Sequence, residues 1–146
     1  MINLETHFEV ENFRVNHRNL TFLCELVLKE YSDFENGNIS IIFSNNNHLN
    51  KLKIDHFNED VLTDVITFVY EKEIERIDLE IYISVEMAIE NAQENNVSFN
   101  NELKRLVVHG ILHAIDYNDQ DGESQKIMYK LQEEIVKKFS GHIIHE

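Results

Sequence analysis

Apolar and polar residues recur along the chain with two periods, and these periods predict strands and helices. Near the N-terminus, Ile2–Val10 mixes the two kinds of residue in partial alternation and predicts a strand. Val15–Tyr31 carries Leu20, Leu23 and Val27 at helical spacing and predicts an amphipathic helix. Short runs rich in β-branched and aromatic residues predict three further strands, at Ile39–Phe43, Val65–Tyr70 and Leu79–Ser84.

Capping residues and turn residues mark the remaining elements. The run Asn36–Asn38, which contains Gly37, is typical of a turn before a strand, and a short helix is expected over Asn47–Phe57. Ser84 is suited to cap a helix over Val85–Asn95. A helix over Glu102–Ile115 has possible starts at Ser98 and Asn100. A last helix is expected over Gly122–Phe139, with an inner face of Ile127, Met128, Leu131, Ile135 and Val136.

These elements together predict one α+β domain over residues 1–146. The expected fold is a small mixed sheet of about four strands with helices before, between and after them, in three layers. The sequence contains no repeat, low-complexity tract or linker that would indicate a domain boundary.

Composition narrows the class of protein. Hydrophobic residues make up 42% of the chain, which is typical of a folded protein. No apolar run approaches the roughly 18 residues that a membrane span needs, and the N-terminus lacks the pattern of a secretory signal, so no membrane partner is expected. The single cysteine, Cys24, excludes an intrachain disulfide, lies in an apolar run where a buried thiol is expected, and fits the cytoplasm. A net charge of −14 argues against an ordinary electrostatic nucleic-acid binder and against DNA as a partner.

A pair of histidines is the strongest candidate for chemistry. His109 and His113 are four residues apart, so on a helix they lie one turn from each other on one face. Two imidazoles at this spacing can bind one zinc ion, and Asp119 follows closely enough for the chain to fold back and offer a carboxylate. Three protein ligands with an open fourth position are the catalytic arrangement of zinc, so we expect one Zn²⁺ per chain at His109, His113 and Asp119.

A structural interpretation competes with the metal site. The chain has eight histidines, so a pair at this spacing also arises by chance, and a helix with one buried and one exposed histidine explains it. The zinc-protease pattern H-E-x-x-H is absent, because Gly110 stands where the glutamate should be.

Three ordered blocks resemble the YbeY family of rRNA-maturation endoribonucleases. The segment from His109 to His113, followed by Tyr117, resembles the family's H-G-x-L-H-x-x-G-Y-D-H. The segment Leu62–Phe68 resembles its T-D-V-L-S-F block, and Leu79–Ser84 resembles its G-D-I-x-I-S block. The order and separation of the blocks match as well, over more than half of the chain.

The resemblance implies a metal-dependent, zinc-containing endoribonuclease of single-stranded RNA. Members of the family act in 16S rRNA 3′-end maturation and ribosome quality control, so the implied partners are ribosomal RNA and the small ribosomal subunit. The implied chemistry is metal-assisted hydrolysis of a phosphodiester bond. The family's first two histidine ligands correspond to His109 and His113. No residue beyond the metal ligands is assigned a catalytic role.

Asp119 departs from the family, whose third ligand is histidine. A carboxylate brings negative charge to the ion, which should make it a weaker Lewis acid than it would be among three neutral imidazoles. A harder oxygen ligand should also widen tolerance for manganese or magnesium.

The family's arginine before T-D-V-L-S-F, proposed to handle phosphate, is also missing. Ungapped alignment puts Phe57 at its place, with His56 as the nearest cationic candidate. Four further positions differ from the pattern: Asp116 replaces glycine, Asn118 replaces aspartate, Val69 replaces proline and Glu80 replaces aspartate.

Several polar residues carry two interpretations each. Thr63 and Asp64 are expected to cap or pin a strand rather than to catalyse, and Glu80 is expected to be either a base near the metal or a partner of a ligating histidine. Lys104 and Arg105 either contact RNA or occupy an exposed helix face. His142 and His145 are expected to be tail residues.

Two other functions compete with the endoribonuclease. A metal-dependent hydrolase of another substrate, such as a peptide, shares the ligands but is disfavoured by the missing glutamate. A non-enzymatic ribosome-assembly factor with a structural zinc is favoured by the missing arginine and the acidic charge. Cleavage assays on RNA and casein, and a His113→Ala variant, distinguish these functions.

Overall fold

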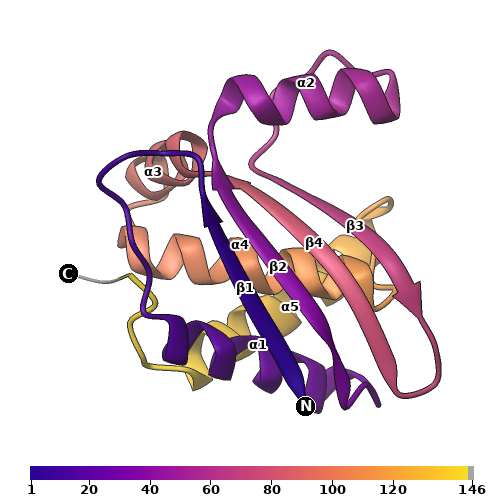
Figure 1. The fold of residues 1–146 in the computed structure, drawn as a ribbon. Helices are drawn as coiled ribbons and strands as arrows, with labels where there is room; N and C mark the ends of the chain where they lie inside the picture. The colour runs from indigo at the N-terminus through magenta and orange to yellow at the C-terminus, as the bar shows by residue number, and fades with distance from the viewer. Residues whose placement is uncertain (145–146) are drawn as a thin grey trace.

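Four strands form one mixed sheet in the computed structural model, which describes residues 1–144. The strands are β1 (Ile2–Phe8), β2 (Asn36–Ser44), β3 (Val65–Lys72) and β4 (Arg76–Ser84). Their order across the sheet is β1-β2-β4-β3, as Figure 1 shows. β2 runs parallel to β1 and to β4, and β3 pairs antiparallel with β4. β1 and β3 are therefore the two edge strands.

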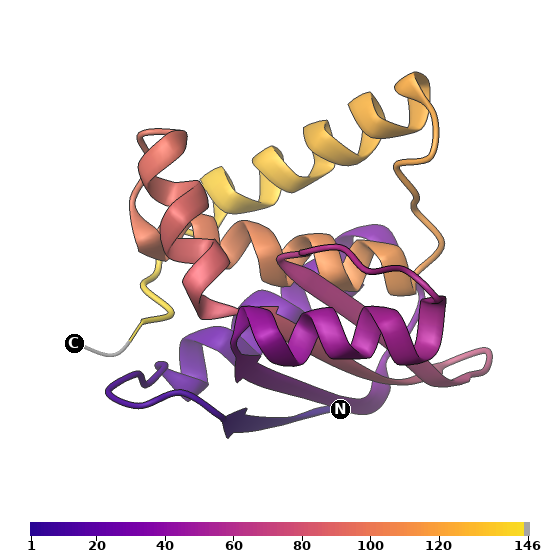
Figure 2. The same ribbon diagram turned by 90° about the horizontal axis from the view of Figure 1, so that it is seen from above.

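Five helices surround the sheet. They are α1 (His17–Tyr31), α2 (Asn46–Phe57), α3 (Val85–Glu94), α4 (Phe99–Ala114) and α5 (Gly122–Lys138). α1 and α4 cover one face of the sheet, α2 lies on the other, and α3 and α5 pack on α4 (Figure 2). The expected α+β fold, with a mixed four-strand sheet between helical layers, is confirmed.

The main core lies between the sheet and the α1–α4 layer. Alternate residues of the central strands point to this face, because side chains of a strand alternate between its two sides. Those of β2 and β4 are almost completely buried: Ile39, Ile41, Phe43, Ile77, Leu79, Ile81 and Ile83. α1 contributes Leu20, Leu23 and Val27, and α4 contributes Leu103, Val107 and Ile111.

Each helix begins at a residue whose side chain accepts a hydrogen bond from the backbone two or three positions into the helix. The caps are Asn16, Asn45, Ser84, Ser98 and Asp121, with distances of 2.8 to 3.2 Å. These oxygens satisfy backbone N–H groups that have no partner inside the helix. The predicted cap at Ser84 is confirmed, and of the two predicted starts for α4 the first, Ser98, is used.

The expected turn at Asn36–Asn38 is wrong, because these residues are the first three of β2. Gly37 has φ +149°, and a Cβ there would lie 1.8 Å from the carbonyl oxygen of Ile77 on β4. The glycine thus permits close approach of two strands rather than a reversal of the chain.

Two other local predictions are corrected. α4 ends at Ala114, one residue before the predicted end at Ile115, and Asp116 takes the left-handed conformation with φ +78°. That conformation accounts for the glycine which the family has at this position. In α5 the predicted inner residue Ile127 is 48% exposed, and Gln132 is buried instead.

Residues 1–144 include no helix that is both long enough and apolar enough to span a membrane. Cys24 is completely buried, as predicted. His142 is exposed and its carbonyl accepts a hydrogen bond from Asn19, while His145 lies outside the described residues.

Candidate metal centre

α4 places the two histidines on one side, facing the same space. The Nε2 atoms of His109 and His113 are 2.9 Å apart, and the ring planes lie at 72° to each other. Both side chains are partly buried, 24% and 34% exposed. The helical spacing read from the sequence therefore does bring the two ring nitrogens together.

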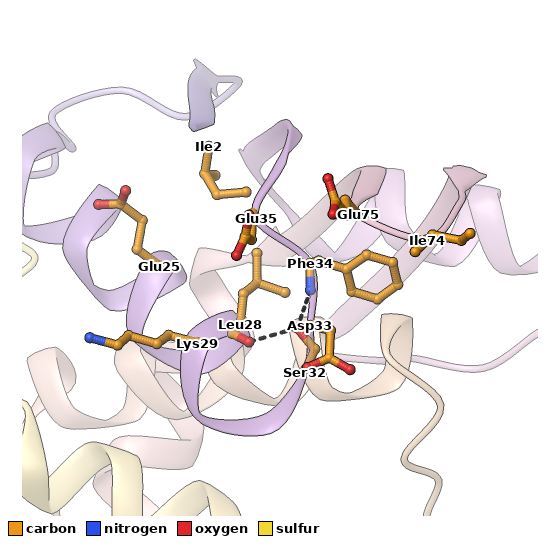
Figure 3. Close-up of a pocket in the computed structure, with 10 residues that line it drawn as sticks. All are labelled: Ile2, Glu25, Leu28, Lys29, Ser32, Asp33, Phe34, Glu35, Ile74 and Glu75. Atoms are coloured by element: carbon orange, nitrogen blue, oxygen red, sulfur yellow. Dashed lines mark hydrogen bonds between the residues drawn. The ribbon is translucent and has the colours of Figure 1, made fainter.

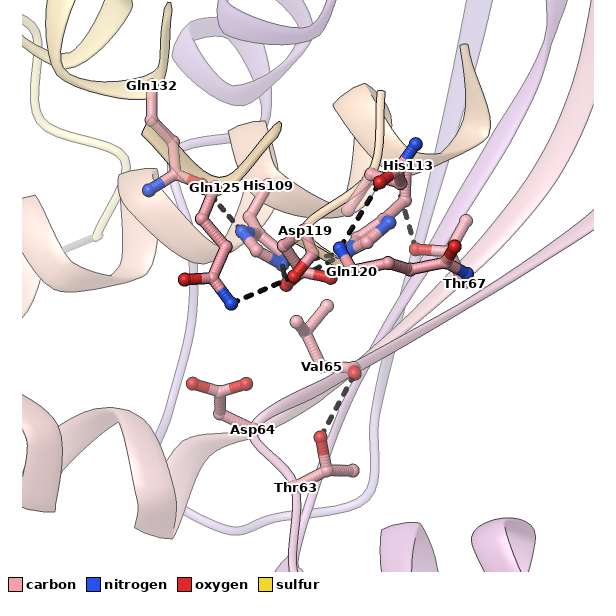
Figure 4. Close-up of polar contacts among 12 residues, drawn as sticks. Thr63, Asp64, Val65, Thr67, His109, His113, Asp119, Gln120, Gln125 and Gln132 are labelled. Carbon is pink, nitrogen blue, oxygen red and sulfur yellow. Dashed lines mark hydrogen bonds and ion pairs between the residues drawn. The ribbon is translucent and has the colours of Figure 1, made fainter. Parts of the chain in front are cut away.

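Gly110 fixes how closely this helix approaches the sheet. A Cβ at Gly110 would lie 3.0 Å from Ile81 and 3.1 Å from Thr67, so there is no room for a larger side chain without movement. Thr67 also donates a hydrogen bond from Oγ1 to the Gly110 carbonyl at 3.0 Å (Figure 4). The residue beside His109 thus anchors the helix to β3 and β4. A glutamate base of the zinc-protease kind has no place there.

Gln132 of α5 orients the first histidine. Its Oε1 accepts a hydrogen bond from Nδ1 of His109 at 2.6 Å, which leaves the Nε2 lone pair facing His113 and Asp119. Metal-binding histidines characteristically use the second ring nitrogen in this way. Sequence reasoning missed Gln132. The signal was a polar residue four positions after Met128 and four before Val136, on the apolar face of α5.

Asp119 completes the cluster from the loop between α4 and α5. Its Oδ2 lies 3.7 Å from Nε2 of His109 and 3.8 Å from Nε2 of His113. The three ligand atoms all lie within 4.8 Å of one another, and the Asp119 side chain is 47% exposed. Two imidazole nitrogens and one carboxylate oxygen gathered at this spacing fit a small divalent cation.

The electrostatics of the site favour neutral imidazole. Burial lowers the pKa of His113, and the neighbouring His109 and Lys53 lower it further, while Asp119 opposes them. A lowered histidine pKa keeps the ring unprotonated at neutral pH, which is the form that binds a metal ion.

Lys53 is a second residue that sequence reasoning missed. It lies on α2, and its Nζ sits 4.6 Å from the centroid of the Phe57 ring. Ungapped alignment puts Phe57 at the place of the family's arginine. Lys53 lies one helical turn earlier, so its ammonium group reaches the side chain at that place. The predicted cationic candidate, His56, instead packs edge-on against Phe68.

Two basic residues of α4 are engaged in ion pairs or buried. Arg105 donates to Glu133 from Nε at 2.6 Å and to Glu102 from Nη1 at 2.7 Å. Lys104 is 2% exposed and donates to the Phe139 carbonyl. The prediction that they contact RNA or line an exposed helix face is wrong for both, because α5 and the C-terminal segment cover this part of α4.

Glu80 lies on the opposite face of the sheet. Its neighbour Ile81 packs on Gly110, so alternation along β4 directs Glu80 away from α4. Its Oε1 accepts a hydrogen bond from the Tyr70 hydroxyl at 2.9 Å. Both predicted roles of Glu80, as a base near the metal and as a partner of a ligating histidine, are therefore wrong.

Thr63 and Asp64 lie where β3 begins, below the histidines in Figure 4. Asp64 accepts a hydrogen bond from Asn91 through Oδ2 at 3.0 Å and from the Ser84 amide through its carbonyl at 2.9 Å. These contacts join β3, β4 and α3, so the structure agrees with the pinning role predicted for Asp64. Within residues 1–144, Thr63 donates only to the Val65 carbonyl of its own segment, at 3.4 Å.

Of two cavities, one adjoins the ligand cluster and the other lies apart from it. A pocket of about 160 Å³ opens directly beside His109 and Asp119. A larger cavity of about 630 Å³ lies among the start of β1, the end of α1 and the β3–β4 turn, and contains none of the three ligand residues (Figure 3). The carboxylates of Glu25, Asp33 and Glu75 point in different directions around it and form no cation site.

Comparison with known proteins gives one consistent match. The family described as endoribonuclease YbeY matches residues 3–140. An endoribonuclease YbeY of Flavobacterium johnsoniae is 34% identical over 137 residues, which cover 94% of each chain. That of Flavobacterium psychrophilum is 35% identical, also over 94% of each chain. That of Geobacillus thermodenitrificans is 33% identical over 79% of this chain and 83% of the relative.

A solved structure has the same fold. The solution structure of a Thermotoga maritima protein matches with a TM-score of 0.58 and 27% sequence identity, over 95% of this chain and 89% of that chain.

Proposed function

This chain belongs to the endoribonuclease YbeY family, and on that premise we propose that it is a zinc-dependent enzyme that cleaves single-stranded RNA during rRNA maturation. As a member of this family it is a nuclease, acting on phosphodiester bonds. We propose 16S rRNA 3′-end processing and ribosome quality control as its roles, with ribosomal RNA and the small ribosomal subunit as partners in the cytoplasm. The observation that carries the proposal is the convergence of His109, His113 and Asp119 within 4.8 Å.

The three ligand residues would hold one zinc ion. When bound, the ion supplies Lewis-acid polarisation of a phosphate oxygen and lowers the pKa of water. Gln132 keeps the His109 ring turned so that Nε2 faces the ligand cluster. Asp119 adds a negative charge, which weakens the Lewis acidity relative to a three-histidine site and widens tolerance for manganese or magnesium.

Lys53 is the residue that we assign to the phosphate charge. Its ammonium group lies against Phe57 and close enough to His113 to lower the pKa of that ring. A positive charge on this side of the ligand cluster attracts the anionic backbone of RNA. Arg105 is unsuited to the task, because two carboxylates already neutralise it.

A single strand suits this site better than a duplex. The three ligand side chains are one-quarter to one-half exposed, and His109 and Asp119 also line a small pocket. An unpaired strand can bring one phosphate against these three side chains and turn its bases freely, whereas a duplex holds its phosphates on the outside of a wide cylinder and its bases in the stack.

The decisive experiment is cleavage of single-stranded RNA by the wild type and by His113→Ala. We expect the variant to lose cleavage while its far-ultraviolet circular dichroism and its unfolding midpoint in chelator stay unchanged. His7→Ala is the matched control, because His7 lies on the outer face of β1 and is more than half exposed. Equal cleavage by His113→Ala and the wild type would overturn the proposal.

The same assay separates the alternatives. Casein offered beside RNA should remain intact, whereas cleavage of casein alone would identify a peptidase. Accumulation of 16S rRNA with unprocessed 3′ ends in cells that carry only His113→Ala would support the maturation role. A complete rescue of such cells by a variant without cleavage activity would indicate a non-enzymatic assembly factor.

A further inference from the structure

The small pocket beside the ligand cluster is lined on the α5 side by uncharged side chains. It is formed by His109 and Asp119 together with Gln125, Met128, Tyr129 and Gln132. The four residues of α5 are spaced at i, i+3, i+4 and i+7, so they share one face of that helix. Their side chains extend the site beyond the metal ligands along α5.

Each of these side chains offers a different contact. Met128 is buried, 2% exposed, and gives an apolar floor, whereas the Tyr129 ring is 63% exposed. Gln132 is buried, with a relative exposure of 6%, and its Oε1 already accepts from Nδ1 of His109, so Nε2 is the amide atom that it can offer to a ligand. Gln125 donates to the Asp119 carbonyl at 2.9 Å, and its amide lies on the same side of His109 as that of Gln132 (Figure 4).

This lining fits a neutral planar ring with polar edges. An aromatic face is a platform for stacking, and carboxamides hydrogen-bond the donors and acceptors of a base edge. The pocket contains no lysine or arginine, and the Asp119 carboxylate at its mouth repels anions, so a phosphate is disfavoured there. A volume of about 160 Å³ accommodates one base but not a longer segment of chain.

We infer that this pocket is a nucleobase subsite, in which a base next to the cleaved phosphodiester stacks on Tyr129 and presents its edge to the amides of Gln125 and Gln132. The inference rests on the proposed RNA cleavage for its substrate. Because the subsite adjoins the ligand cluster, it selects which bond of an unpaired strand is placed there.

Abasic scanning tests the subsite. A single abasic nucleotide is moved through an RNA of defined cleavage position, and kcat/KM is measured for each. In the wild type we expect a loss of about tenfold or more at one position near the cleaved bond, because stacking of one base contributes about 1–3 kcal/mol. Tyr129→Ala should lower kcat/KM for unmodified RNA by the same factor. For this variant, kcat/KM should then be the same for the unmodified RNA and for the RNA with the abasic nucleotide at that position.

Two variants serve as controls. Tyr129→Phe should retain the preference, since it keeps the ring and loses only the hydroxyl. Tyr70→Ala removes an equally exposed tyrosine on the outer face of the sheet and should change no substrate's kcat/KM. Zinc content should be the same in all of these proteins.

A binding measurement keeps this inference separate from the proposed function. Fluorescence anisotropy of the same labelled RNAs, recorded in chelator so that no cleavage occurs, should show the same position-specific loss and the same dependence on Tyr129. Cleavage by the wild type with independent, additive losses from the abasic nucleotide and Tyr129→Ala would overturn the subsite alone. Position-specific binding without any RNA cleavage would support the subsite and overturn the nuclease function.

Discussion

Gln132 determines which nitrogen of His109 is available as a ligand. Its amide oxygen accepts the Nδ1 hydrogen at 2.6 Å, and the Gln132 side chain is held between α5 and α4 with a relative exposure of 6%. A side chain that never touches an ion can therefore influence how tightly the ion is held.

We expect Gln132→Leu to weaken zinc affinity by about 10- to 100-fold, because the ring loses both its orientation and its tautomer preference. Competition titration against a chromophoric chelator measures the affinity. Gln93→Leu, at an exposed position of α3, is the matched control and should bind zinc as the wild type does. Unchanged affinity in Gln132→Leu would remove the orienting role.

Cys24 is a buried thiol whose chemistry is suppressed by its surroundings. Burial raises the pKa of Cys24 to about 12, against an ordinary value of about 8.5. At pH about 8 the native protein should resist iodoacetamide, whereas the chain in guanidinium chloride should be alkylated completely. Intact-mass measurement gives the extent, and rapid labelling of the native protein would contradict the buried placement.

The raised pKa of Cys24 also makes the free energy of unfolding depend on pH. Between about pH 8.5 and pH 12 the folded chain retains the Cys24 proton that the unfolded chain loses, so this residue lowers the free energy of unfolding as the pH rises through that range. Below pH 8.5 both states are protonated and the residue contributes no pH dependence.

At the scale of elements, α4 is positioned by its closest contact with the sheet. Gly110 meets Ile81 and Thr67 at distances that leave no space for a side chain, and the histidines lie on either side of it along the helix. Gly110 therefore sets how closely α4 packs on the sheet, and this packing in turn sets where the two histidines lie.

Gly110→Val should lower the free energy of unfolding by about 1–3 kcal/mol, since overpacking forces the helix away from β3 and β4. Urea denaturation in chelator measures this change. Gly122→Val is the matched control, because a Cβ at the start of α5 meets nothing within 4 Å. Equal losses in the two variants would indicate an effect of valine on helices rather than of packing.

The order and type of the elements could be predicted from the sequence because each depends on local periodicity. The histidine pair was predictable for the same reason, since four residues of helix fix its geometry. Gln132 and Lys53 could not be found in this way. Their roles depend on how α5 and α2 pack on other elements, which no local pattern specifies.

Local signals also failed where tertiary contacts decided the conformation. The run Asn36–Asn38 has the composition of a turn, but pairing with β4 extends it, and Gly37 serves the close approach of strands. Glu80 was placed near the metal by its position in a family block, whereas strand alternation directs it to the other face.

At the scale of the whole molecule, the ligand cluster joins α4 to the loop that leads into α5. An ion bound to His109, His113 and Asp119 would therefore link segments that are otherwise connected only by the chain and by packing. A ligand that binds the native state alone stabilises it by mass action.

Zinc should raise the unfolding midpoint by roughly 5–10 °C at a hundredfold excess over its dissociation constant, which corresponds to about 2.7 kcal/mol. Differential scanning calorimetry measures the shift, and chelator should reverse it. His113→Ala should abolish the shift and Asp119→Ala should reduce it. Metal analysis of protein purified without added metal gives a second readout: occupancy unaffected by Asp119→Ala would remove Asp119 from the ligand set.

Asp119 differs from the two histidines in where the fold puts it. The histidines are held by a helix wedged against the sheet, whereas Asp119 lies in an exposed loop whose side chain is nearly half open to solvent. Substitutions at a loop position carry little penalty in folding free energy, so selection can exchange histidine and carboxylate there while the core stays the same. Under the proposed ligand set, Asp119 is thus the ligand that a single substitution exchanges between carboxylate and imidazole, and with it the preference for a metal, without rebuilding the protein around it.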